Sequence, residues 1–126
     1  MKRILLVEDD PAVNYILKRY LEKAGFDVIA ASGPREALGL FASSPVDLVV
    51  TDFRMPGMSG EELLLQLRAE RPALPALIVS AYANELTLQI PGVPVLSKPV
   101  DAGELVGLVN NFLLDAETMA LNRPAG

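Results

Sequence analysis

The chain has 126 residues, 51% of them hydrophobic and 21% charged, and this length and composition predict one globular domain with a sizeable core. Cysteine and histidine are both absent from the sequence, which excludes disulfides, zinc–thiolate sites, thiol catalysis and histidine general bases. The net charge is −5, basic residues are scattered, and no apolar run approaches the ~20 residues of a membrane span, so we expect a cytoplasmic protein with no nucleic-acid partner and no membrane insertion.

Five short apolar runs recur along the chain, and each is continuous rather than alternating, which is typical of strands buried on both faces. In chain order they are residues 4–7, 28–30, 48–50, 76–79 and 93–96.

Four stretches with helical periodicity alternate with these strands, and each opens with residues that commonly begin or cap a helix. The openings are Asp10-Pro11, Ser32-Gly33-Pro34, Ser59 with Glu62 three residues later, and Asp101 with Glu104 three residues later. The segment 81–92 leaves at most two helical turns before Pro91-Gly92, so we expect a short or irregular fourth helix there.

Strands that alternate with helices predict an α/β domain in which right-handed crossovers place helices on both faces of a parallel sheet. For five strands, the flavodoxin-like, doubly wound order 2-1-3-4-5 is the natural choice. Ligands of such sheets bind where the strand order reverses, beyond the carboxyl ends of strands 1 and 3. We expect residues 1–115 to form this domain and residues 116–126 to form a flexible C-terminal tail.

Polar side chains follow four of the predicted strands. They are Glu8, Asp9 and Asp10 after the first strand, Asp52 after the third, Ser80 at the end of the fourth and Lys98 after the fifth. Because the first and third strands are neighbours, Glu8, Asp9 and Asp52 must nearly share a pocket. Carboxylates at such distances repel one another by roughly a kcal/mol or more. Lys98 and a hard divalent ion would compensate for this charge, and a few oxygen ligands suit Mg²⁺ better than Ca²⁺.

An aspartate beside a metal ion and a lysine can act as a nucleophile toward a phosphoryl group and form an aspartyl phosphate. The metal ion and Lys98 would then neutralise the transferring oxygens, while the Ser80 hydroxyl donates a hydrogen bond to one of them. Each residue alone has an ordinary explanation, and Asp10 is more readily a helix N-cap than a metal ligand. The prediction of a phosphoryl-accepting site is specific because residues from four strand ends converge at one edge of the sheet.

At these positions the sequence resembles the receiver domains of two-component response regulators, over essentially residues 2–114. The resemblance is carried by residues 4–10 (ILLVEDD), 47–60 (DLVVTDFRMPGMSG), 80–81 (SA) and 98–99 (KP). The run 92–99 (GVPVLSKP) is similar to that of receivers at the carboxyl end of hybrid sensor histidine kinases.

The resemblance implies that Asp52 accepts a phosphoryl group from a histidine kinase or phosphotransfer domain. It also implies that Asp9, Asp52 and the backbone carbonyl of Arg54 bind Mg²⁺ directly, while Glu8 acts through a water molecule. The expected function is that of a phosphorylatable signalling domain, not an enzyme with an external substrate, whose conformational switch regulates a downstream protein.

The same resemblance makes Ser80 the switch hydroxyl and Lys98 the phosphate-binding lysine. Receivers usually carry an aromatic residue three positions before the lysine, and Val95 occupies that position here. Two side chains, Arg54 and Tyr82, would flank the path of the water that hydrolyses the aspartyl phosphate. Neither side chain is suited to orient that water, so we expect slow self-dephosphorylation.

Two other functions are compatible with parts of the same pattern. A pseudo-receiver would be an interaction module that no longer takes phosphate, although Asp9, Asp52, Ser80 and Lys98 are all in place. A phosphohydrolase of the haloacid dehalogenase type would use Asp52 as nucleophile with a second aspartate two residues later as general acid, and that position is Arg54.

Overall fold

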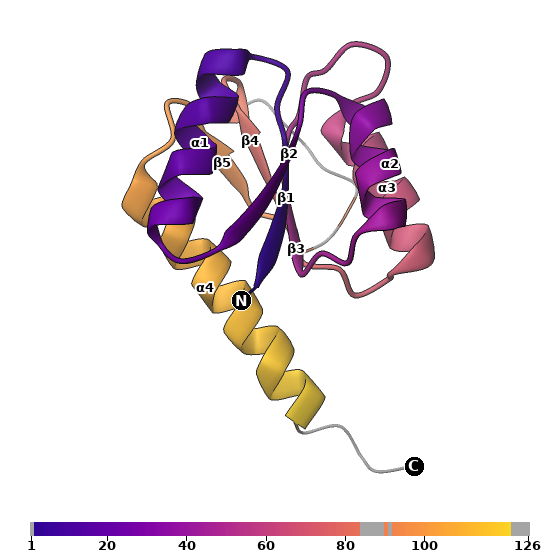
Figure 1. Ribbon diagram of the computed structural model, residues 1–126, viewed down its shortest axis with the longest axis vertical. Helices are drawn as coiled ribbons and strands as arrows, with labels where there is room; N and C mark the ends of the chain where they lie inside the picture. The colour runs from indigo at the N-terminus through magenta and orange to yellow at the C-terminus, as the bar shows by residue number, and fades with distance from the viewer. Residues whose placement is uncertain (1, 84–89, 91, 122–126) are drawn as a thin grey trace.

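The computed structural model describes residues 2–83, 90 and 92–121, and for residues 116–121 it gives only the course of a helix. Strands and helices alternate along the chain (Figure 1). The elements are β1 (Arg3–Val7), α1 (Pro11–Lys23), β2 (Asp27–Ala31), α2 (Pro34–Ser43), β3 (Leu48–Asp52), α3 (Gly60–Glu70), β4 (Ala76–Ser80), β5 (Val95–Ser97) and α4 (Ala102–Leu121).

The five strands form one parallel sheet in the order β2-β1-β3-β4-β5, which confirms the predicted flavodoxin-like topology. Helices α1 and α4 cover one face of the sheet, and α2 and α3 cover the other (Figure 1). Residues of β1 alternate between these faces, with Leu6 packed toward α1 and α4 and Leu5 toward α2 and α3. Because both faces are covered, β3 and β4 are apolar except at their carboxyl ends, and β1 is apolar except for Arg3 at its start.

The predicted starts of α1 and α3 are confirmed by their side-chain caps. Asp10 is the N-cap of α1, where its side chain accepts hydrogen bonds from the backbone N–H groups of Ala12 and Val13. Ser59 is the N-cap of α3 and accepts a hydrogen bond from the backbone N–H of Glu62 at 3.1 Å. These caps satisfy amide groups that have no partner within the helix.

The predicted bounds of the fifth strand differ from those in the structure. The fifth strand was expected at residues 93–96 but covers Val95–Ser97, because Pro94 has no N–H to donate to a strand ladder. Helix α4 continues to Leu121 (yellow in Figure 1).

The expected short helix within residues 81–92 lies largely outside the described residues. None of the helices in the described part of the chain is both long enough and apolar enough to cross a membrane.

Candidate functional site

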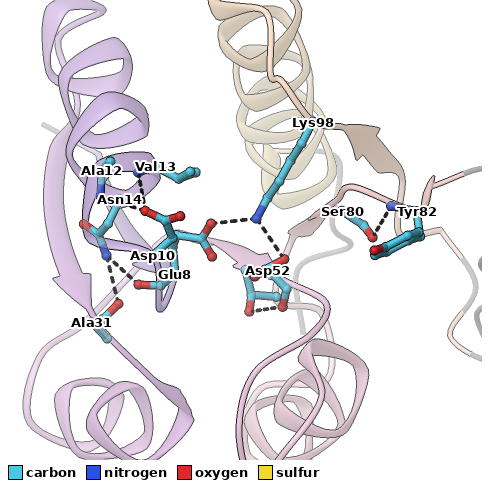
Figure 2. A network of polar contacts seen from close by, with 11 residues as sticks. Glu8, Asp10, Ala12, Val13, Asn14, Ala31, Asp52, Ser80, Tyr82 and Lys98 are labelled. Atoms are coloured by element: carbon cyan, nitrogen blue, oxygen red, sulfur yellow. Dashed lines mark hydrogen bonds and ion pairs between the residues drawn. The ribbon is translucent and has the colours of Figure 1, made fainter.

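The polar residues predicted to meet at the carboxyl edge of the sheet do lie together there (Figure 2). Parallel register aligns the ends of neighbouring strands, pairing Val7 with Thr51, Asp52 with Val79 and Ser80 with Ser97. The residues that follow each of these strands therefore lie at the same edge of the sheet.

Lys98 joins the two buried carboxylates of this site. Its Nζ lies 2.6 Å from Oε1 of Glu8 and 3.2 Å from Oδ1 of Asp52. Glu8 is fully buried, Asp52 is 7% exposed, and the Lys98 side chain is largely buried. Two carboxylates facing one ammonium leave an excess of negative charge in a poorly solvated place, so the site favours a further cation or a proton.

The titration properties of the site follow from this arrangement. Burial, followed by the neighbouring carboxylate of Asp52, raises the pKa of Glu8 to about 7, even though Lys98 acts in the opposite direction. Burial alone would lower the pKa of Lys98, but its hydrogen bond to Glu8 and the charge of Asp52 raise that pKa overall. Lys98 is therefore positively charged at neutral pH, whereas Glu8 titrates near neutrality.

Three carboxylates could hold a metal ion. One oxygen from each of Glu8, Asp9 and Asp52 lies within 4.8 Å of the others, while ligands of a Mg²⁺ ion at about 2.1 Å are spaced by roughly 3 to 4 Å. Oε2 of Glu8 is buried and has no hydrogen-bond partner among the described residues. Buried acceptors normally have a partner, and a hard cation with its bound water would provide one. The donor set therefore fits a divalent ion.

The backbone of Asp52 is fixed by its neighbours. Its carbonyl oxygen accepts a hydrogen bond from Oγ1 of Thr51 at 2.9 Å. Gly60, the first residue of α3, lies so close that a Cβ atom there would overlap this carbonyl oxygen. The Gly60 N–H also donates to the carbonyl of Phe53 at 2.7 Å. The start of α3 is thus pressed against the end of β3, which only a glycine permits.

Ser80 lies on the opposite side of Asp52 from Glu8 (Figure 2). Its hydroxyl oxygen accepts a hydrogen bond from the backbone N–H of Tyr82 at 3.0 Å. Its carbonyl accepts one from the backbone N–H of Lys98 at 3.0 Å, so Ser80 also fixes where the Lys98 side chain begins. The Lys98–Pro99 peptide bond is cis.

Two other residues singled out in the sequence have different positions. Asp10 caps α1 and does not belong to the carboxylate group that could hold a metal ion. Arg54 follows Asp52 by two residues, in the loop between β3 and α3, and its guanidinium group lies over the ring of Tyr82.

One residue at the site was not predicted from the sequence. Asn14 of α1 donates hydrogen bonds through Nδ2 to the backbone carbonyls of Glu8 at 3.0 Å and Ala31 at 3.1 Å. Asparagine has a low helix propensity, so its presence in the second turn of an otherwise regular helix was the available signal.

Comparison with known proteins gives the family. The model of the response regulator receiver domain matches residues 4–110. The DNA-binding transcriptional regulator NtrC of Salmonella typhimurium is 34% identical over 114 residues. This match covers 87% of the present chain but only 24% of NtrC, so the chain spans about a quarter of that relative's length.

Solved structures similar to this chain are receiver domains as well. The response regulator TrrA of Thermotoga maritima, in complex with Mg²⁺ and BeF, aligns with a TM-score of 0.78 and 30% identity over 89% of this chain and 99% of that one. The receiver domain of the hybrid histidine kinase CckA aligns with a TM-score of 0.77 and 34% identity over 88% and 98%, in keeping with the resemblance to hybrid kinases. With the family model, the strand order and the acidic pocket in agreement, the chain belongs to the receiver domains of response regulators.

Proposed function

We propose that Asp52 accepts a phosphoryl group from the phosphohistidine of a histidine kinase or phosphotransfer domain, in a Mg²⁺-dependent reaction. The observation that carries this proposal is the position of Asp52, whose Oδ1 lies 3.2 Å from Nζ of Lys98 and whose carboxylate lies beside those of Glu8 and Asp9. A carboxylate held between an ammonium group and a cation-binding group is well placed to take an anionic phosphoryl group.

The transfer is a substitution at phosphorus. A carboxylate oxygen of Asp52 forms the new P–O bond, the P–N bond to the donor imidazole breaks, and its electron pair remains on the imidazole nitrogen. Lys98 stays charged because its pKa is raised, and its Nζ, already within reach of Asp52, donates to an oxygen of the transferred group. Lys98 offsets part of the charge that the phosphoryl group brings, and a bound cation would offset more of it.

The Ser80 hydroxyl is prepared to respond to the new group. Because its oxygen already accepts the N–H of Tyr82, its own proton remains available for donation to a phosphoryl oxygen. Such a hydrogen bond would pull on the segment that begins at Tyr82, and we propose that this movement alters the surface that a downstream protein recognises.

The proposed Mg²⁺ ligands are Asp9, Asp52 and the backbone carbonyl of Arg54, with Glu8 acting through water. Bound there, Mg²⁺ would supply Lewis-acid stabilisation of the phosphoryl oxygens. Support comes from the spacing of the three carboxylates and the unpartnered Oε2 of Glu8, and from the Mg²⁺ in the similar TrrA structure.

The proposed activity is confined to the domain's own phosphorylation and dephosphorylation, in the cytoplasm. A haloacid dehalogenase-type hydrolase needs a general acid two residues after its nucleophile. Arg54 occupies that position and lies over Tyr82, so turnover of phosphate esters is not expected. The division into a domain over residues 1–115 and a tail over residues 116–126 stays a prediction.

The test is the intact mass of the protein after incubation with acetyl phosphate and Mg²⁺. We expect wild type to gain one phosphoryl group, Asp52→Asn to gain none, and the control Asp115→Asn, at an exposed position of α4, to behave like wild type. Failure of wild type to gain mass would favour the pseudo-receiver, and continuous release of phosphate would favour the hydrolase.

A further inference from the structure

We infer that Asn14 is a positioning residue that holds the loop between β1 and α1 in the conformation needed to bind the cation. The inference rests on the proposed Mg²⁺-dependent function and adds a residue outside the ligand set. Asn14 lies on α1, while the two carbonyl groups that it binds lie at the carboxyl ends of β1 and β2.

The hydrogen bonds of Asn14 form part of a closed network (Figure 2). The carbonyl oxygen of Ala31 accepts both the Nδ2 group of Asn14 at 3.1 Å and the backbone N–H of Glu8 at 3.1 Å. The carbonyl of Glu8 accepts the other Nδ2 bond at 3.0 Å. Both backbone polar groups of Glu8 therefore have a partner. The N–H donates directly to β2, and the carbonyl accepts a hydrogen bond from Asn14.

This network matters most for Asp9, which is the exposed member of the carboxylate group. The residue before it, Glu8, is held by Asn14 and Ala31. The residue after it, Asp10, is held as the N-cap of α1. The backbone on both sides of Asp9 is therefore fixed in the folded chain, so less conformational entropy is lost when the side chain binds a cation.

Close-packed side chains do not support the loop between β1 and α1 on the side where Asn14 lies. A cavity of about 360 Å³ opens there, and its lining includes Glu8, Asp9, Asn14, Lys18 and Glu36. Hydrogen bonds replace the support that close-packed side chains give elsewhere in the core. A primary amide suits the position because one nitrogen carries two N–H groups for two carbonyls, which neither a carboxylate nor an aliphatic side chain can supply.

The test compares Asn14→Leu and Asn14→Ala with the matched controls Asn111→Leu and Asn111→Ala, which change an exposed residue of α4. Leucine and alanine are better helix formers than asparagine, so neither change opposes α1. Two quantities are measured, the Mg²⁺ concentration that gives half the maximal rate of phosphorylation by acetyl phosphate, and the rate at saturating Mg²⁺.

We expect the Asn14 variants to require about tenfold more Mg²⁺, as is usual when a residue supporting a metal ligand is lost, while the rate at saturating Mg²⁺ stays near that of wild type. The Asn111 variants should match wild type in both quantities. Isothermal calorimetry with Mg²⁺ alone should show the same loss of affinity.

An unchanged Mg²⁺ requirement in the Asn14 variants would overturn the inference. A lower saturating rate with an unchanged requirement, or the unfolding of both variants, would also overturn it, because Asn14 would then support the fold in general. These outcomes are distinct from failure of the proposed function, in which wild type itself binds no Mg²⁺ and takes no phosphoryl group.

Discussion

The guanidinium carbon of Arg54 lies 4.7 Å from the centre of the Tyr82 ring. Arg54 follows Asp52 by two residues, and Tyr82 follows Ser80 by two residues, so the pair joins the loops that leave β3 and β4 beside the proposed phosphoacceptor. Tyr82 is also held through its backbone N–H, which donates to Oγ of Ser80. The two side chains that were expected to flank the site are therefore in contact with each other.

We predict that the Arg54–Tyr82 pair hinders the attacking water and so lengthens the lifetime of the aspartyl phosphate. We expect Arg54→Ala, Tyr82→Ala and the double variant all to lose phosphate faster than wild type after the donor is removed. A cation–π contact at an exposed site contributes about 0.5–1 kcal/mol, which corresponds to a coupling of about two- to fivefold between the single variants. A double variant that decays no faster than wild type would show that these side chains do not protect the site.

The raised pKa of Glu8 predicts that Mg²⁺ binding depends on pH. Burial and the neighbouring carboxylate of Asp52 raise this pKa to about 7, so at lower pH the cation must displace a proton. We expect Mg²⁺ affinity to fall as the pH decreases below about 7, by up to about tenfold per unit for one proton. Glu8→Gln cannot ionise and should bind Mg²⁺ more weakly at alkaline pH, but with little dependence on pH. Calorimetric titrations between about pH 5.5 and about pH 8 test this, and a wild-type affinity that is constant across the range contradicts it.

Asp9→Ala separates charge repulsion from cation binding. Mg²⁺ should stabilise wild type by about 2.7 kcal/mol at a concentration of 100 times Kd, and the variant should lose this response. In metal-free buffer the variant should be at least as stable as wild type, because one repelling carboxylate is gone.

Thermal unfolding with EDTA and with Mg²⁺ measures both effects of Asp9→Ala. The control is Asp115→Ala, which removes an exposed carboxylate of α4 far from the site and should not lower the stability while keeping the response to Mg²⁺. A full Mg²⁺ response in Asp9→Ala would rule out Asp9 as a ligand.

The close approach of α3 to Asp52 predicts a strong effect of Gly60→Ala. The added Cβ would overlap the carbonyl oxygen of Asp52, and overpacking of this kind typically costs about 1–3 kcal/mol. The displaced backbone should also slow phosphorylation of Asp52. Gly39→Ala, in α2, is the matched control. A Cβ there meets nothing within 4 Å among the described residues, and alanine should increase stability by up to about 1 kcal/mol. Equal stability changes for the two variants in urea unfolding would contradict this interpretation.

Local patterns in the sequence were enough to predict the sheet order and the meeting of Glu8, Asp52 and Lys98 at one edge. Strands buried on both faces are apolar, and polar residues appear where they end. The predicted start of the fifth strand was wrong. The apolar run includes Pro94, but Pro94 cannot donate a hydrogen bond to the strand ladder.

Contacts between distant side chains could not be predicted in the same way. Lys98 and Glu8 are 90 positions apart, and the topology places both at one edge without specifying that they pair. The Asn14 hydrogen bonds depend on how closely the ends of β1 and β2 approach α1. The stacking of Arg54 on Tyr82 depends on the paths of two loops. Each of these is a tertiary relationship with no counterpart in local periodicity.

Chemical reduction can show whether Asp52 is the residue that carries the phosphoryl group. Sodium borohydride reduces an aspartyl phosphate to homoserine, so the protein can be phosphorylated with acetyl phosphate and Mg²⁺, reduced, digested and sequenced by mass spectrometry. We expect homoserine at position 52 alone, only when both donor and Mg²⁺ were present, and none in Asp52→Asn. Homoserine at another aspartate, or none at position 52 in a phosphorylated sample, would contradict the assignment.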